Sequence, residues 1–189
     1  MKKLLRTTSL ISVLALPLNA MAADYVIDTS NAHASVNFKV SHLGYSFIKG
    51  RFNTFSGEFS YDADNLTASK VNVTVDTTSL DTNHAERDKH IRSDDFIYAS
   101  KFPEAKFTST RVTELSDGKL AINGDLALHG KTRPITIEAS FIGEGKDPWG
   151  GYRVGFVGKT RLELADFDIT VMGPASYVDM ELYVEGIRQ

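Results

Sequence analysis

Apolar and polar residues alternate along much of the chain with the two-residue period of β-strands. The alternation is clearest in five segments, at 71–75, 120–122, 126–128, 135–141 and 178–184. Weaker alternation marks four more, at 33–40, 50–62, 104–114 and 151–164. Because 120–128 reads as one strand, the pattern predicts about eight strands. Each has one apolar and one polar face, as in an antiparallel sheet.

Short turns separate these strands. Gly, Pro, Asp, Asn and Ser gather at the predicted turns, at 62–65, 116–118, 129–130, 147–151 and 173–174. Sequential strands with short connections favour a meander. A meander of eight strands can close on itself, which removes the exposed sheet edges that invite aggregation. We therefore predict an all-β fold, an eight-stranded antiparallel β-barrel.

Glycines interrupt two of the predicted strands. Gly57 lies in one, and Gly155 and Gly158 lie in another. Glycine weakens a strand, so it usually marks a bulge, a sharp bend or a place where a ligand passes close to the backbone. Both a bend and a ligand remain open as explanations at this point.

The segment 81–103 departs from the strand pattern, because it is charged and has helical periodicity. Asn83 is predicted to cap a helix, and Asp88 and Arg92 have the i,i+4 spacing of a favourable ion pair. We expect a helical insert at about 83–99. Inserts that depart from a regular scaffold often carry function.

The N-terminal residues have the features of an export signal. Residues 1–22 combine a basic start, an apolar run at 10–18 and a small-x-small motif at 20–22. This pattern predicts a signal peptide cleaved after Ala22 and a periplasmic protein. The apolar run is too short to span a bilayer comfortably, so no transmembrane segment is expected. Residues 23–189 suit a single domain.

Composition excludes some classes of function. The chain has 24 acidic and 21 basic residues, and three of the bases lie in the predicted signal peptide. No basic stripe remains to meet the phosphates of a nucleic acid, so a nucleic-acid partner is not expected. The chain has no cysteine, which leaves neither disulfides nor a thiol nucleophile.

The candidate chemistry of the insert does not form a metal site. His84 and His90 are six residues apart, which places their side chains about 120° apart on a regular helix, so one ion cannot bind both.

The segments 158–160 and 130–132 lack the earlier glycine of a phosphate-binding loop. We predict no catalytic residues, no metal and no cofactor.

Aromatic residues are abundant, with 11 Phe, 7 Tyr and 1 Trp. A well-packed core explains them, and so does an apolar lumen. An eight-stranded barrel is about wide enough to be filled by side chains or to hold one small ligand. Composition leaves both explanations open.

Several segments resemble the YceI-like family of periplasmic proteins. They are NHAERDKHIRSDDF and KFPEAKF in the insert, HLGYSFIKGRF at 42–52, NGDLALHGKTRPI at 123–135 and GKDPWGGYRVGF at 145–156. The resemblance extends through essentially the whole chain after the predicted signal peptide. It implies a lipocalin-like β-barrel whose elongated apolar cavity binds a polyisoprenoid lipid, such as an isoprenoid quinone or a prenyl phosphate. It thus implies a binding or carrier protein and no enzyme.

We expect apolar side chains to line this cavity, namely Phe38, Phe47, Phe52, Phe55, Phe96, Phe102, Phe107, Leu126, Ile137 and Phe141. If the insert covers an opening, the headgroup candidates at the mouth are His84, Arg87, His90 and Arg92. Arginine could pair with an anionic headgroup, whereas a neutral quinone needs only a donor or two. A static cap and a moving lid are both open for the insert.

Two other functions stay open. One is an enzyme that acts on an isoprenoid lipid through carboxylates and histidines of the insert. The other is a stress-related structural or interaction protein in which the cavity is incidental. The expected partner is the isoprenoid lipid. The oligomeric state is open, with a homodimer as one option.

Overall fold

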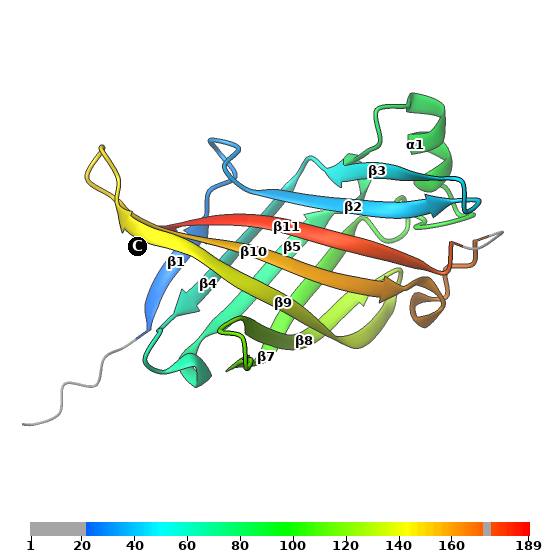
Figure 1. The fold of residues 1–189 in the computed structure, drawn as a ribbon. Coiled ribbons are helices and arrows are strands. Elements are labelled where there is room, and N and C mark those ends of the chain that lie inside the picture. The colour runs from blue at the N-terminus through cyan, green and yellow to red at the C-terminus, as the bar shows by residue number, and fades with distance from the viewer. Residues whose placement is uncertain (1–21, 172–174) are drawn as a thin grey trace, which may run out of the picture.

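The computed structural model describes residues 22–171 and 175–189, and their regular structure is almost entirely β (Figure 1). The strands are β1 (Ala23–Ile27), β2 (Ser35–His42), β3 (Ser46–Phe52), β4 (Phe55–Tyr61), β5 (Lys70–Asp76), β6 (Leu80–Asp81), β7 (Glu104–Glu114), β8 (Leu120–Leu128), β9 (Lys131–Lys146), β10 (Tyr152–Glu163) and β11 (Tyr177–Arg188). The helices are α1 (Ala85–Ile91) and the 3-10 turns η1 (Leu66–Ala68), η2 (Thr77–Ser79) and η3 (Leu164–Phe167).

Two further sequence predictions concern the N-terminal signal peptide and the absence of a transmembrane segment. The predicted signal peptide, residues 1–22, lies outside the described residues except for Ala22. Within the described ranges, no helix combines the length and the apolar character needed to cross a membrane.

The strands form one closed antiparallel barrel. Their order is β1-β4-β5-β7-β8-β9-β10-β11, and β1 also pairs with β11, which closes the circle. Strands β2, β3 and β6 lie outside this circle and lengthen the barrel wall. They do so because β11 pairs with β1 only at 186–188, and its earlier residues, 178–183, pair with β2. The fold is an eight-stranded closed barrel, so the predicted fold class is confirmed.

The single strand predicted at 50–62 is instead two strands, β3 and β4. Asn53 and Thr54 separate them. The backbone N–H of Asn53 donates to the carbonyl oxygen of Ser79 at 3.1 Å, and that of Thr54 donates to Ser79 Oγ at 3.0 Å. The prediction is wrong here because these bonds draw the chain toward the segment that leads into the insert.

Two of the strand glycines have structural explanations. The register between β9 and β10 shifts between Gly155 and Phe156, so Gly155 marks a bulge of the kind that bends a barrel wall. Gly57 permits close packing, because a Cβ there would lie 2.7 Å from the carbonyl oxygen of Asn72. Neither residue needs a ligand to explain it.

The insert begins with α1 and continues as turns to Lys101. The helix is shorter than predicted, and its cap is His84, whose Nδ1 accepts from the backbone N–H of Arg87 at 3.2 Å. The predicted Asn83 cap is wrong. Asn83 has a φ of 62°, in the left-handed region, because it makes the turn between β6 and the helix.

The predicted ion pair between Asp88 and Arg92 is also wrong. The buried Asp88 carboxylate accepts hydrogen bonds from the backbone N–H and the hydroxyl of Thr82. Arg92 Nη1 donates to the carbonyl oxygens of Leu80 at 2.8 Å and Thr78 at 3.3 Å. Both side chains therefore fasten α1 to the chain that precedes it.

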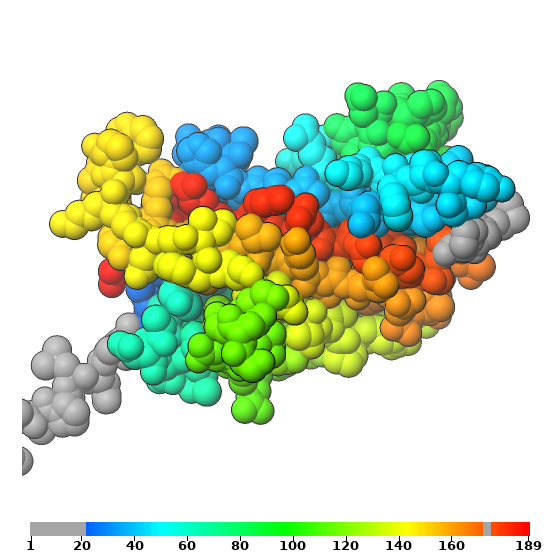
Figure 2. Space-filling model, viewed as in Figure 1, coloured from blue at the N-terminus to red at the C-terminus, as the bar shows by residue number. Residues whose placement is uncertain are grey.

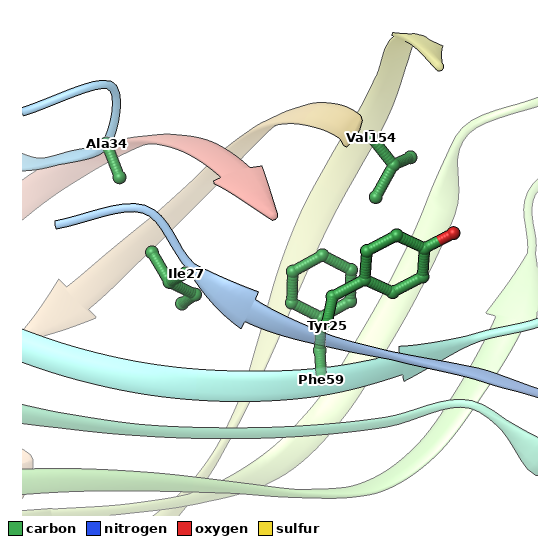
Figure 3. Packing of buried hydrophobic residues seen from close by; sticks show 5 residues of the cluster. All are labelled: Tyr25, Ile27, Ala34, Phe59 and Val154. Carbon is green, nitrogen blue, oxygen red and sulfur yellow. The ribbon is translucent and has the colours of Figure 1, made fainter. Parts of the chain in front are cut away.

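Aromatic side chains fill the end of the barrel away from α1. The buried rings of Tyr25 and Phe59 stack with centroids 5.0 Å apart, and Figure 3 shows them beside Val154. Phe156 makes edge contacts with Phe59 at 6.0 Å and with Tyr61 at 5.1 Å. We call Tyr25, Phe59, Tyr61 and Phe156 the aromatic plug, and this end of the barrel the closed end.

Candidate functional site

The barrel encloses a cavity of about 500 Å³, within the range of roughly 300–1,000 Å³ that is usual for small-molecule sites. Its wall runs from Phe59 and Tyr61 in the aromatic plug to Arg87 and His90 on α1. Among the described residues that line the cavity there is no Asp or Glu. The cavity is therefore an apolar chamber whose arginine and histidine side chains lie at one end.

The cavity reaches the surface beside α1. Leu43 and His90 both line it, and both side chains are more than half exposed. His42 and Arg87 line the same region. We call these four residues the mouth. The mouth and the aromatic plug occupy opposite ends of the barrel, as Figure 1 shows from the positions of α1 and β1.

Most of the predicted apolar residues lie on the cavity wall, namely Phe38, Phe52, Phe55, Phe96, Phe107, Leu126 and Ile137. They come from the insert and from six different strands, which the barrel brings together. Contact with a ligand stays a prediction for each of them.

Phe47 lies away from the wall, which corrects its expected place. Successive side chains of a strand point to opposite faces, and Ile48 takes the inward position on β3. Phe47 faces outward and is 60% exposed, with Lys39 Nζ 4.9 Å from its ring centroid.

Phe102 and Phe141 are likewise corrected. The Phe102 ring packs against His129 in the turn between β8 and β9, with centroids 5.0 Å apart. Phe141 lies beside the aromatic plug, with its centroid 5.7 Å from that of Phe156. The position of each residue along the barrel, rather than its aromatic character, decides whether it lines the cavity.

Aliphatic residues that the aromatic criterion missed make up much of the wall. Strands β5 and β11 supply Val71, Val73, Val75, Val178, Met180 and Leu182. Their signal was the strict alternation of these two segments, which marks an inward face even without aromatic residues. His42 and Leu43 at the mouth had no such signal, because they lie where β2 turns into β3.

Gly158 also lines the cavity. A Cβ at this position would lie 3.0 Å from Ile137 Cγ2 and 3.4 Å from Leu182 Cδ1. Any larger residue would fill space between β9 and β11. For Gly158, unlike Gly57 and Gly155, the explanation that glycine leaves room beside a ligand stays open.

Arg87 is held in position at the mouth. Its Nε donates to Thr82 Oγ1 at 2.7 Å, and its Nη2 donates to the carbonyl oxygen of Thr82 at 2.8 Å. The hydroxyl of Thr82 in turn donates to the buried Asp88 carboxylate. Two donors of the guanidinium are thus occupied, and the Nη1 donors stay available for a ligand.

The other predicted headgroup residues divide into two groups. His90 lines the mouth, with its Nε2 3.3 Å from Asp95 Oδ2 and its ring 4.9 Å from that of Phe96. His84 and Arg92 lie off the cavity wall, where His84 caps α1 and Arg92 bonds to backbone carbonyls. Their prediction as mouth residues is corrected, because the ends of a short helix need those side chains as partners.

A second polar cluster lies at the closed end. The Arg153 guanidinium donates to Asp28 Oδ2 at 2.7 Å, to Asp147 Oδ2 at 2.8 Å and to Glu185 Oε1 at 2.5 Å. Asp28 is only 1% exposed. His33 Nδ1 lies 3.1 Å from Asp28 Oδ2. We call these five residues the arginine cluster.

The cluster shifts the acidity of its members. Burial alone raises the pKa of Asp28, but hydrogen bonds from Arg153, Asn31 and His33 outweigh it and hold that pKa well below its usual range. Hydrogen bonds to Asp28, Asp147 and Glu185 raise the pKa of Arg153 further above its ordinary value. Asp28 and Arg153 are therefore both ionised at neutral pH.

The same cluster contains a group with the composition of a metal site. Ligand atoms of Asp28, His33 and Glu185 all lie within 4.8 Å of one another. The Arg153 guanidinium already neutralises Asp28 and Glu185, so a cation would have to displace it. The geometry fits a structural ion network better than a metal centre.

Comparison with known proteins places the chain in a family. The model of the YceI-like domain matches residues 25–185. A UPF0312 protein of Vibrio parahaemolyticus is 70% identical over 189 residues, which cover 100% of both chains.

Solved structures share the barrel. The Campylobacter jejuni YceI protein has a TM-score of 0.71 and 25% identity, covering 79% of this chain and 90% of that one. A polyisoprenoid-binding domain from Saccharophagus degradans has a TM-score of 0.63 and 14% identity, covering 89% of this chain and 99% of that one. From the family match and the close relative together, we conclude that the chain belongs to the family of proteins with a YceI-like domain.

Proposed function

We propose that the protein binds one long-chain isoprenoid lipid, with the tail in the cavity and the headgroup at the mouth, and carries it in the periplasm. The observation that carries this proposal is the shape and chemistry of the cavity, an apolar chamber of about 500 Å³ that ends at Arg87 and His90. A molecule with a long apolar tail and one polar end matches that distribution.

Tail burial provides the driving force but little selectivity. Each CH₂ group removed from water contributes about 0.8 kcal/mol. A membrane offers the tail an equally apolar environment, so most of this gain cancels when the lipid comes from a bilayer. Selectivity therefore depends on the length of the cavity and on the contacts of the headgroup.

Arg87 supports a headgroup that accepts hydrogen bonds. Thr82 orients the guanidinium through Nε and Nη2, so little side-chain freedom is lost when Nη1 binds a ligand. A quinone carbonyl can accept one such bond. A prenyl phosphate can accept stronger, charge-assisted bonds. We propose a lipid of the quinone or prenyl-phosphate type.

Two further observations support the proposal. The Saccharophagus degradans domain, described as polyisoprenoid-binding, has the same barrel. Residues 1–22 have the pattern of an export signal, which supports a periplasmic location. A binding and carrier role is the simplest use of a chamber whose wall is mostly apolar.

Native mass spectrometry tests the proposal directly. Protein purified from its host without detergent is expected to carry an adduct with the mass of an isoprenoid lipid. Mass spectrometry of the extracted lipid then distinguishes a quinone from a prenyl phosphate. A protein that is empty in every preparation, and that takes up neither lipid when both are added, contradicts the proposal.

A matched pair of variants tests the cavity itself. Thr160 lines the cavity on β10, whereas its neighbour Lys159 is exposed. Thr160→Phe is expected to weaken binding of an added isoprenoid quinone by about tenfold or more, equivalent to 1.4 kcal/mol. Lys159→Phe adds the same ring outside and should leave affinity unchanged. Equal affinities in folded variants would place the lipid elsewhere.

A second pair tests the headgroup. Arg87→Gln removes the cation at the mouth, while Lys89→Gln removes an exposed cation from the same helix. For a prenyl phosphate, Arg87→Gln should weaken binding much more than Lys89→Gln does. For a quinone the difference should be small.

A further inference from the structure

The hairpin of β2 and β3 carries a patch of exposed apolar side chains next to the mouth. Tyr45 is 88% exposed, Phe47 60% and Leu43 53%. Single exposed apolar residues are common on protein surfaces, but grouped ones mark contact sites. We call these three residues the hairpin patch.

The hairpin patch is continuous with the cavity. Leu43 belongs to both, and its neighbour His42 also lines the cavity. The same two strands supply Val40 and Ile48 to the cavity wall. Figure 2 shows the cyan residues of this hairpin beside the green insert, at one end of the molecule. A tail that leaves the mouth would therefore meet the hairpin patch.

The charge of this region differs from that of the rest of the chain. Residues 29–57 contain no Asp or Glu, although the chain has 24. Lys39 and Lys49 face each other across β2 and β3. Lys39 Nζ lies over the Phe47 ring and 3.5 Å from Asp179 Oδ2 on β11, a carboxylate that Arg161 also binds. A basic and aromatic surface on an acidic protein has the composition that binds anionic lipid headgroups.

We propose that the β2–β3 hairpin docks the protein on an anionic lipid bilayer. Leu43, Tyr45 and Phe47 enter the headgroup region, and Lys39 and Lys49 meet lipid phosphates. Tyrosine suits this boundary because its ring is apolar and its hydroxyl is polar. The inference rests on the proposed function, since docking places the mouth where a tail can pass between membrane and cavity.

The closed end provides a matched control. Trp149 is 80% exposed and Ile142 64%, so these residues are comparably exposed. Both lie on β9 or the turn that follows it, at the end of the barrel that the aromatic plug fills. If exposed apolar area alone bound membranes, either end would serve.

Vesicle sedimentation tests the docking. The purified protein is mixed with vesicles of phosphatidylglycerol and phosphatidylethanolamine, or of phosphatidylcholine alone. The protein is expected to bind the anionic vesicles, and Tyr45→Ser/Phe47→Ser should weaken this binding by about tenfold. Lys39→Gln/Lys49→Gln should weaken it and reduce its dependence on salt. Trp149→Ser/Ile142→Ser should bind as the unchanged protein does.

Some outcomes overturn the inference. One is a protein that ignores anionic vesicles even at low salt. Another is hairpin variants that bind as well as the control variant, as expected if the hairpin patch docks a partner protein instead. Thermal unfolding checks that every variant is folded.

Uptake of an isoprenoid quinone from detergent micelles separates this inference from the proposed function. Hairpin variants should take up the quinone from micelles as well as the unchanged protein, but collect it more slowly from vesicles. If the unchanged protein takes up no quinone from micelles, the proposed function is contradicted. Vesicle binding alone would still support docking.

Discussion

The two ends of the barrel use the same kinds of residues in opposite ways. At the closed end the aromatic rings of Tyr25 and Phe59 are buried against each other, and Arg153 is neutralised by three carboxylates. In the hairpin patch beside the mouth, the rings of Tyr45 and Phe47 are exposed. Arg87 there is hydrogen-bonded to the neutral Thr82.

The difference indicates a division of roles along the barrel axis. Aromatic burial and charge pairing at the closed end stabilise the fold. At the mouth and the hairpin patch, exposed rings and a guanidinium with unoccupied donors suit the binding that we propose. Changes at the closed end should therefore lower stability more than affinity, and changes at the mouth should do the reverse.

The largest expected effect comes from Phe59→Ala. The change leaves a void beside Tyr25 and Phe156 in the aromatic plug, and the free energy of unfolding should fall by about 4 kcal/mol. Phe96→Ala, which removes a half-buried ring next to His90 of the mouth, should cost less than half as much. Urea denaturation measures both. Equal losses would break the proposed division between the ends.

Asp28→Asn should have the next largest effect. The variant leaves Arg153 short of its most buried partner, so the free energy of unfolding should fall by about 3 kcal/mol. Glu181→Gln, which removes an exposed pair with Lys159, serves as the control and should cause no measurable loss. Denaturation in urea at neutral pH distinguishes the two.

Thr82→Val should affect both stability and binding. The isosteric change removes the hydroxyl that donates to the buried Asp88 and accepts from Arg87, at a cost of about 2 kcal/mol. Affinity for an isoprenoid with an acceptor headgroup should also fall, because the guanidinium loses its fixed orientation. The exposed Thr132→Val is the control. Unchanged affinity would mean that Arg87 does not meet the headgroup.

The smallest effect is a dependence on acid pH. The pKa of Asp28 is lower in the folded protein than the unfolded value of about 3.9. Its contribution to stability is therefore complete above the unfolded pKa and is lost as the pH falls toward the folded pKa. The free energy of unfolding should decline below about pH 4, and less steeply in Asp28→Asn. Parallel curves for the two proteins would contradict this assignment.

The strand pattern predicted most of the barrel because burial imposes a local period. A side chain at every second position faces the interior, so the spacing of Val71, Val73 and Val75 was enough to predict that all three face inward. The same rule separates Ile48 from Phe47, yet both are apolar and the sequence does not say which of them faces inward. Pairing of β3 with β2 and β6 decides it.

The ends of the barrel were less predictable. The cap of α1 falls on His84 rather than Asn83 because the turn out of β6 places Asn83 in the left-handed region. The hairpin patch was visible in the sequence as a family-like segment, but not its place beside the mouth. Only the arrangement of strands around the cavity brings it next to Arg87 and His90.

By itself the sequence determined that the chain is a barrel of alternating strands with one charged insert, because period and turn chemistry are local properties. Tertiary structure alone decided which end is closed. Asp28, Arg153 and Glu185 come from distant parts of the chain, and no local pattern links them. Their attraction acts through space, so the arginine cluster exists only once the barrel has closed.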